Sequence, residues 1–82
     1  MWFAYALLSG SDGGFYVGMT NDIERRVREH NSGYNRSTRS RVPFTLIYSE
    51  ECASSGDARK REKYLKSGQG RDFLKSQASK WF

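Results

Sequence analysis

The chain has 82 residues, a formal net charge of +5, and 37% hydrophobic and 15% aromatic residues. This size suits a single domain over residues 1–82, and the apolar content favours a folded core over a disordered chain. No apolar run approaches the roughly 20 residues of a membrane span, the N-terminus lacks the basic start of a signal peptide, and the lone Cys52 excludes a disulfide framework. We therefore expect a cytoplasmic protein.

The first part of the chain predicts a β-hairpin. Residues 2–8 (WFAYALL) and 15–19 (FYVGM) are rich in the side chains that favour strands, and the SGSDGG segment at 9–14 predicts the turn between them. Gly18 lies inside the second strand, where glycine is unfavourable unless another group must approach the backbone closely.

The next segment predicts a helix with a basic face. Asn21 is the expected N-cap, Glu24 completes a capping box, and residues 32–33 (Ser-Gly) end the helix. An apolar pair four residues apart forms a narrow stripe, and His30 follows along its edge. Arg26 precedes His30 by one turn, so both side chains project from one side of the helix.

Three further elements follow a basic loop at 34–43, which is closed by the only proline. Residues 44–50 (FTLIYSE) predict a third strand. A second helix is expected over 57–67, capped by Ser54 or Ser55 and ended by Gly68, and a third over 71–82 with Phe73, Leu74 and Trp81 on its apolar side. The order β-β-α-β-α-α predicts an α+β domain whose third strand joins the first two in one sheet.

The positive charge is concentrated in two segments. Residues 1–20 contain no Lys or Arg, residues 21–41 contain six, and residues 59–66 contain five. An apolar beginning followed by two basic segments indicates a core with one side facing a polyanion. The plainer alternative is a solvated surface with a mild basic bias.

Glu62 is the most unusual residue of the second predicted helix. Ala58, Glu62 and Leu65 share one face, so a carboxylate lies on or beside the stripe that packs on the sheet. Such a carboxylate costs free energy unless it is paired or bound to a metal. The alternatives are an ion pair, with Arg61, Lys66 or an arginine of the first helix, and metal ligation.

The other candidate residues also have ordinary structural alternatives. Arg26 can cover the apolar stripe or clamp an anion, a lone histidine such as His30 is more often structural, and Tyr5 and Tyr16 are common types of sheet residue. Their combination with Glu62 over one sheet face is less ordinary. It would supply the anion clamp, the base and the metal ligand of a metal-assisted phosphodiesterase.

In this order and spacing, the residues resemble the GIY-YIG nuclease superfamily, and most of all its small stand-alone bacterial members. FAY (3–5) keeps the tyrosine of the family's first motif, and YVG (16–18) matches the second with Val in place of Ile. Arg26 and REHN (28–31) resemble the arginine and histidine segment, and ARKREKYLK (58–66) resembles the glutamate helix. The resemblance covers essentially the whole chain.

The resemblance implies a three-stranded antiparallel sheet flanked by helices, and metal-dependent cleavage of DNA phosphodiester bonds. By matching positions, it implies an active-site set of Tyr5, Tyr16, Arg26, His30 and Glu62. Two features of many relatives do not occur in this sequence: an asparagine downstream of the glutamate, and a separate domain that selects the DNA site. Little intrinsic sequence specificity is therefore expected.

In this interpretation Glu62 binds one Mg²⁺ or Mn²⁺, Arg26 neutralises charge on the scissile phosphate, and Tyr5, Tyr16 or His30 acts on the attacking water. The cations expected to hold flanking phosphates are Arg36, Arg39, Arg41, Lys60 and Lys63.

The expected partner is DNA, including branched or single-stranded DNA, with no membrane and no obligate protein partner. One alternative is a nucleic-acid-binding module that uses the same basic face without turnover. Another is a small domain that docks an acidic protein.

Overall fold

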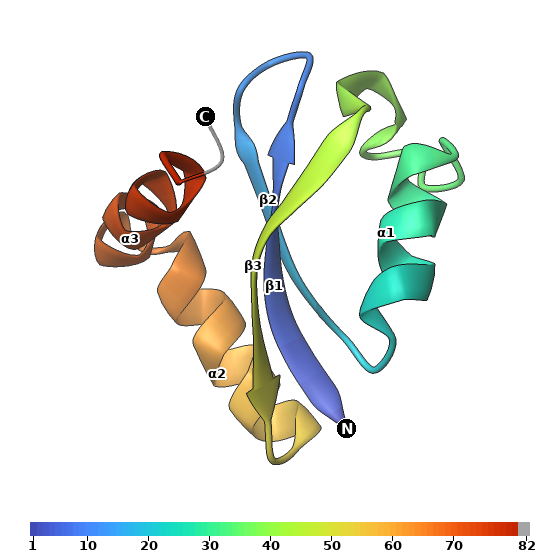
Figure 1. Ribbon diagram of the computed structural model, residues 1–82. Helices are drawn as coiled ribbons and strands as arrows, with labels where there is room; N and C mark the ends of the chain where they lie inside the picture. The colour runs from blue at the N-terminus through green and yellow to red at the C-terminus, as the bar shows by residue number, and fades with distance from the viewer. Residues whose placement is uncertain (81–82) are drawn as a thin grey trace.

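A three-stranded antiparallel sheet with helices on both faces forms the domain, as seen in the computed structural model, which describes residues 1–80 (Figure 1). The elements are β1 (Trp2–Ser9), β2 (Phe15–Thr20), α1 (Ile23–Asn31), the short 3₁₀ turn η1 (Arg39–Arg41), β3 (Phe44–Cys52), α2 (Ser55–Lys66) and α3 (Gly68–Ala78). The predicted α+β order and the antiparallel sheet implied by the family resemblance are both confirmed.

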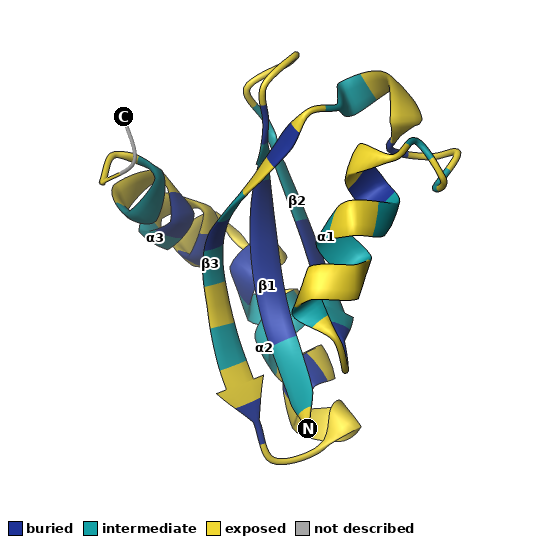
Figure 2. Cartoon of the chain, turned by 45° about the vertical axis from the view of Figure 1, so that its right-hand side comes forward, coloured by how far each residue is buried: buried dark blue, intermediate teal, exposed yellow. Residues whose placement is uncertain are grey.

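The first strand is the centre of the sheet, whose order is β2-β1-β3. It pairs antiparallel with both neighbours, so that Tyr5 lies opposite Gly18 on one side and Ser49 on the other. Its middle residues, 4–7, are all buried (Figure 2). Because both faces of β1 are covered, its apolar side chains run continuously instead of alternating with polar ones.

The two faces of the sheet differ in what covers them. On one face α2 and α3 pack on a core that includes Ala4, Ala6 and Ala58, and these small side chains let α2 approach the central strand closely. On the other face α1 packs on a smaller core built around Tyr5, Leu7 and Phe44. Figure 1 shows α1 on the opposite side of the sheet from α2 and α3.

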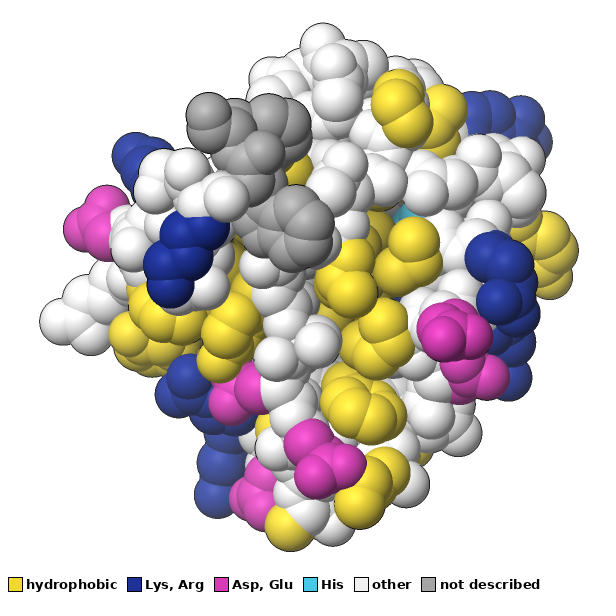
Figure 3. All heavy atoms as spheres, in the orientation of Figure 1, with side chains coloured by type: hydrophobic (Ala, Val, Ile, Leu, Met, Phe, Trp, Pro, Cys, Tyr) yellow, Lys and Arg dark blue, Asp and Glu magenta, His cyan; other side chains and the backbone are white. Residues whose placement is uncertain are grey.

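Helix α1 covers its face only in part. Ile23 and Val27 form the expected apolar stripe and pack on the smaller core, but together with Leu46 of β3 they also line a shallow apolar hollow. Figure 3 shows hydrophobic side chains gathered between β3 and α1, with basic side chains on the outer side of α1.

The ends of the helices differ from the sequence prediction in several places, and α2 begins at Ser55, two residues before its predicted start. The N-cap of α1 is Asp22, whose side chain accepts a hydrogen bond from the Arg25 N–H, so the prediction of Asn21 as the cap is wrong by one residue. Both residue types cap well, and spacing alone does not separate neighbours. The capping of α2 by Ser54, one of the two predicted serines, is confirmed.

The third helix begins three residues earlier than predicted and ends at Ala78, before its predicted end at residue 82. Ser67 has an extended backbone and its hydroxyl accepts from the Gly70 N–H, so the residue that ends α2 also caps α3, and Gly68 starts the new helix. Phe73 and Leu74 pack on the core as expected. Residues 81–82, including Trp81, lie outside the described residues. Among residues 1–80, no helix has the length and apolar character needed to cross a membrane.

Candidate active site

Gly18 is the residue that allows Tyr5 to lie across the sheet. A Cβ atom at position 18 would lie 2.6 Å from the Tyr5 hydroxyl oxygen and 2.9 Å from Cζ. The Tyr5 side chain therefore occupies the space above the neighbouring strand, and its phenol ends beneath α1, only 1% exposed. The close approach expected from a glycine inside the strand is confirmed, and the approaching group is Tyr5.

His30, in the last turn of α1, meets this phenol. Its Nε2 lies 3.3 Å from the Tyr5 hydroxyl, its Nδ1 lies 2.9 Å from Oγ1 of Thr38, and the residue is fully buried. The Thr38 hydroxyl donates to the carbonyl of Asn35, so its oxygen accepts from Nδ1–H. Nε2 is then the acceptor for the Tyr5 O–H.

Burial is the main cause that lowers the pKa of His30, and the nearby Arg26 guanidinium lowers it further, while Glu29 acts in the opposite direction. Burial likewise raises the pKa of Tyr5, and Arg26 offsets part of that rise. At neutral pH the neutral imidazole of His30 therefore accepts a hydrogen bond from the neutral phenol of Tyr5.

Tyr16 continues this aromatic cluster toward solvent. Its ring centroid lies 4.6 Å from that of His30 and 6.5 Å from that of Tyr5. Unlike Tyr5, Tyr16 is only partly buried, and it lies on β2, one of the two edge strands of the sheet. Of the two tyrosines predicted for the site, Tyr16 is thus the one that a solvent molecule can reach.

Arg26 is held beside the cluster by an ion pair within α1. Its Nη1 lies 3.1 Å from Oε1 of Glu29, one turn further along, and 28% of the Arg26 side chain remains exposed. Arg26 therefore combines a fixed position near the two phenols with access for an anion.

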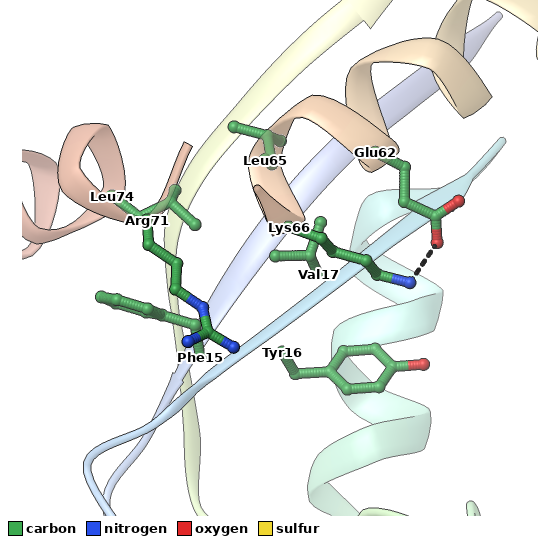
Figure 4. Close-up of a pocket in the computed structure, with 8 residues that line it drawn as sticks. All are labelled: Phe15, Tyr16, Val17, Glu62, Leu65, Lys66, Arg71 and Leu74. Atoms are coloured by element: carbon green, nitrogen blue, oxygen red, sulfur yellow. Dashed lines mark hydrogen bonds and ion pairs between the residues drawn. The ribbon is translucent and has the colours of Figure 1, made fainter. Parts of the chain in front are cut away.

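Glu62 approaches the cluster from the other side of β2. Its side chain, 21% exposed, lines a hollow together with Tyr16, Lys66 and Arg71, which we call the Glu62 hollow (Figure 4). The carboxylate acts electrostatically on the Tyr5 phenol, raising its pKa, as Arg26 acts to lower it. Residues from β1, β2, α1 and α2 that are distant in sequence are thus brought to one edge of the sheet.

An ion pair with Lys66 satisfies the Glu62 carboxylate. Lys66 Nζ lies 3.3 Å from Oε2 of Glu62, one turn along α2, and Figure 4 shows the ammonium group between the carboxylate and the rest of the hollow. Lys66 was among the partners expected from spacing. The ion pair also shows that this carboxylate already faces a cation from within the site.

The donor set fits a hard divalent cation with few protein ligands. Glu62 is a partly buried carboxylate, and no group of three His, Cys, Asp or Glu side chains gathers anywhere in residues 1–80. A partly buried carboxylate of this kind can give a hard cation such as Mg²⁺ one oxygen ligand, with water and phosphate oxygens as the others.

The five cations predicted to hold flanking phosphates are not alike. Arg36, Arg39, Lys60 and Lys63 are exposed. Arg41 instead pairs with Asp12 at 2.7 Å, donates to the carbonyl of Phe15, and lies over the Phe44 ring. In this structure Arg41 fastens the basic loop to the β1–β2 hairpin.

Sequence reasoning missed two contributors to the site. Thr38 lies in a loop without periodicity, so nothing in the sequence indicated that its hydroxyl would be buried against His30. Arg71 was not assigned to the site, and the third helix was predicted to begin only at that residue. Recognising Ser67 as an N-cap would have started the helix at Gly68 and so placed Arg71 in its first turn.

The fold and the site together define a small α+β domain that brings two phenols, a guanidinium, an imidazole and a carboxylate to the edge of a sheet. The catalytic-domain profile of the GIY-YIG family matches residues 1–75, and the chain belongs to this family. It is a nuclease family, whose members generally require a divalent metal, as the sequence resemblance implied.

The similar proteins are small. A UPF0213 protein of Desulfotalea psychrophila is 45% identical over 67 residues, which are 79% of this chain and 60% of that protein. A UPF0213 protein of Halobacterium salinarum is 46% identical over 57 residues, 68% of this chain and 74% of that one. The solution NMR structure of a UPF0213 protein from Bacillus halodurans has a TM-score of 0.55 and 34% identity, covering 93% of this chain and 84% of that one.

Proposed function

We propose that this protein is a metal-dependent endonuclease that hydrolyses DNA phosphodiester bonds with little intrinsic sequence specificity. The observation that supports this most directly is the placement of Glu62 and Tyr16 in one hollow, with Arg26 and His30 behind Tyr16. Family membership supports the reaction class, and the net charge of +5 favours a polyanionic substrate.

Each polar group would have a separate task. Glu62 would hold Mg²⁺ or Mn²⁺, which would supply Lewis-acid stabilisation of charge on the phosphate when bound. Arg26 would bind a non-bridging phosphate oxygen and stabilise the charge that develops there, because its head is partly exposed and its position is fixed by Glu29. Lys66 would leave Glu62 when the metal binds, and its ammonium would be free to contact phosphate.

Tyr16 is the group that we propose to orient and deprotonate the attacking water, because Tyr5 is almost fully buried and already donates to His30. A phenol of ordinary pKa, about 10, is a weak base at neutral pH. Tyr5 and His30 would position the Tyr16 ring, and the neutral imidazole is the other group able to accept a proton.

Removing the Glu62 charge tests the proposal. Glu62→Gln should lower cleavage by at least about 100-fold, since a metal ligand is worth several kcal/mol in the transition state. DNA binding should be kept or strengthened, because a negative charge is lost. The measurement is nicking of plasmid, branched DNA and single strands with Mg²⁺ or Mn²⁺, next to binding measured without metal.

Glu51→Gln is the matched control, because Glu51 is exposed on β3, the opposite edge strand. It should cut like the parent protein. Equal cleavage by Glu62→Gln and the parent would refute the metal assignment. Binding without cleavage on every substrate would favour the alternative of a nucleic-acid-binding module, in which the Glu62–Lys66 ion pair is permanent.

A further inference from the structure

A second hollow continues the Glu62 hollow along the edge of β2. It lies beside the β1–β2 hairpin and is lined by Gly13, Gly14, Phe15, Arg41, Arg71 and Lys75. Phe15 and Arg71 line both hollows, so the two hollows adjoin each other between β2 and α3. We call the two adjoining hollows together the β2-edge groove.

Within the described part of the chain, four basic side chains line the groove, and the unpaired ones lie in its middle. Lys66, Arg71 and Lys75 come from the end of α2 and from α3, and Arg41 closes the far end. The cations at its two ends are ion-paired, Lys66 with Glu62 and Arg41 with Asp12. Among residues 1–80, Arg71 and Lys75 have no acidic partner within 4.0 Å, so their charges are available to an external anion.

The groove is also partly apolar. Phe15 is half-buried at the junction of the two hollows, and Val17, Leu65 and Leu74 contribute to the floor of the Glu62 hollow. Figure 4 shows the Arg71 guanidinium reaching from α3 to the side of Phe15. Such a surface suits a single nucleic-acid strand, because the cations can bind its phosphates and the aromatic ring can stack on an unpaired base.

We propose that the β2-edge groove binds single-stranded nucleic acid on one side of the scissile bond, with phosphates on Arg71 and Lys75 and one base stacked on Phe15. This rests on the proposed function, because the strand would lead directly from Glu62. A duplex would offer only phosphates here, since its bases are already stacked on one another. The substrate class is therefore DNA with a single-stranded segment beside the cleavage point.

The test measures binding of a labelled single strand and of its duplex, without metal, over a range of salt concentrations. Arg71→Ala and Lys75→Ala should each weaken single-strand binding by about 3- to 10-fold and lower the salt slope by about 0.7. Phe15→Leu, which keeps an apolar side chain, should weaken single-strand binding by about 5-fold or more, with little change for duplex.

Arg28→Ala is the matched control, because Arg28 is exposed on α1 beside the apolar hollow at the opposite edge of the sheet. It should leave the single-strand salt slope unchanged. The proposal is wrong if Arg71→Ala behaves like Arg28→Ala, or if Phe15→Leu weakens single-strand and duplex binding equally.

Cleavage by the same variants separates this inference from the proposed function. If the parent protein cuts DNA and Arg71→Ala binds single strands normally, the proposed binding in the groove is wrong and the proposed nuclease activity stands. If the parent never cuts DNA but Arg71→Ala and Phe15→Leu lose single-strand binding as expected, only the proposed nuclease activity is wrong. Thermal unfolding of each variant establishes that it is folded.

Discussion

Gly18 and Tyr5 depend on each other for their positions. The sequence indicated that something must approach the backbone at Gly18, and both residues matched family motifs, but neither fact identified them as partners. The pairing register does so, because Tyr5 lies directly opposite Gly18 and its ring leans over that residue. The Tyr5 phenol on β1 can thus be buried only because Gly18, opposite it on β2, has no side chain.

Gly18→Ala should therefore displace Tyr5 and reduce cleavage. The added Cβ would meet the phenol at 2.6 Å, and overpacking of this kind typically costs about 1–3 kcal/mol of stability. Loss of the contact between Tyr5 and His30 should lower the cleavage rate by more than the loss of folded protein explains. Urea unfolding and cleavage rates at full folding measure the two effects.

Gly56→Ala provides the matched control, because it makes the same change in the first turn of α2, where the nearest atom to a new Cβ is 3.8 Å away. It should be neutral or stabilising by up to about 1 kcal/mol, as alanine favours helix. Normal cleavage by Gly18→Ala would show that Tyr5 can move without consequence for the site.

At the scale of residues, the sequence predicted which residues belong to the site better than it predicted which of them contact one another. Tyr5, Tyr16, Arg26, His30 and Glu62 were selected by type, spacing and family resemblance, and the structure brings them to one edge of the sheet. Their catalytic roles remain predictions. The Thr38 contact to His30 and the engagement of Arg41 by Asp12 join residues that are 8 and 29 positions apart through loops. Local periodicity contains no information about such contacts.

The elements of the fold were more predictable than their boundaries. Alternation, apolar stripes and turn residues indicated three strands and three helices in the observed order, because these patterns follow directly from strand and helix geometry. Boundaries failed where two residues of similar capping ability are adjacent, as with Asn21 and Asp22. They also failed where one serine serves two helices, as Ser67 does.

The junction between α2 and α3 gives the clearest prediction at the scale of elements. A Cβ at Gly70 would run into the backbone of Tyr64 and Leu65 in the last turn of α2. Because backbone atoms cannot move aside as a flexible side chain can, Gly70→Ala should lower the free energy of unfolding by several kcal/mol. It should also displace Arg71 and so weaken single-strand binding. Urea unfolding and oligonucleotide titration measure these effects.

Gly68→Ala is the control for this prediction, because Gly68 starts the same helix and a Cβ there meets nothing within 4 Å. It should be neutral or slightly stabilising. If Gly68→Ala and Gly70→Ala have the same stability, the close packing of α3 against α2 is not a feature of the protein in solution.

For the whole molecule, the edge strand β2 is the feature on which the other properties depend. It carries Tyr16 and Gly18, it separates α1 from α2, and its edge is lined by the β2-edge groove. The sequence predicted the strand but not that it would be at the edge, because strand order depends on where β3 returns after α1. An edge strand leaves one side open, and the proposed nucleic-acid substrate would reach the site from that side.

The buried histidine makes the stability of the molecule depend on pH. In the folded protein the pKa of His30 is lowered, mainly by burial and also by Arg26, whereas the unfolded chain titrates near the ordinary value of about 6.5. Below about pH 6.5 the unfolded state therefore binds more protons than the folded state. The free energy of unfolding should be constant above that pH and fall as the pH decreases toward the folded pKa, by up to about 1.4 kcal/mol per pH unit.

Urea unfolding between pH 8 and pH 5 measures this dependence, and His30→Gln should flatten it. Carboxylates contribute at lower pH: the Asp12 pKa is lowered from 3.8 by Arg41, so its contribution is lost only in strong acid. An unchanged slope in His30→Gln would assign the dependence to other groups.

In the parent protein, protonation of His30 also removes the acceptor of the Tyr5 hydroxyl. Cleavage by the folded protein should therefore decline only at lower pH, as the pH falls through the lowered pKa of folded His30, while His30→Gln should lack this pH dependence.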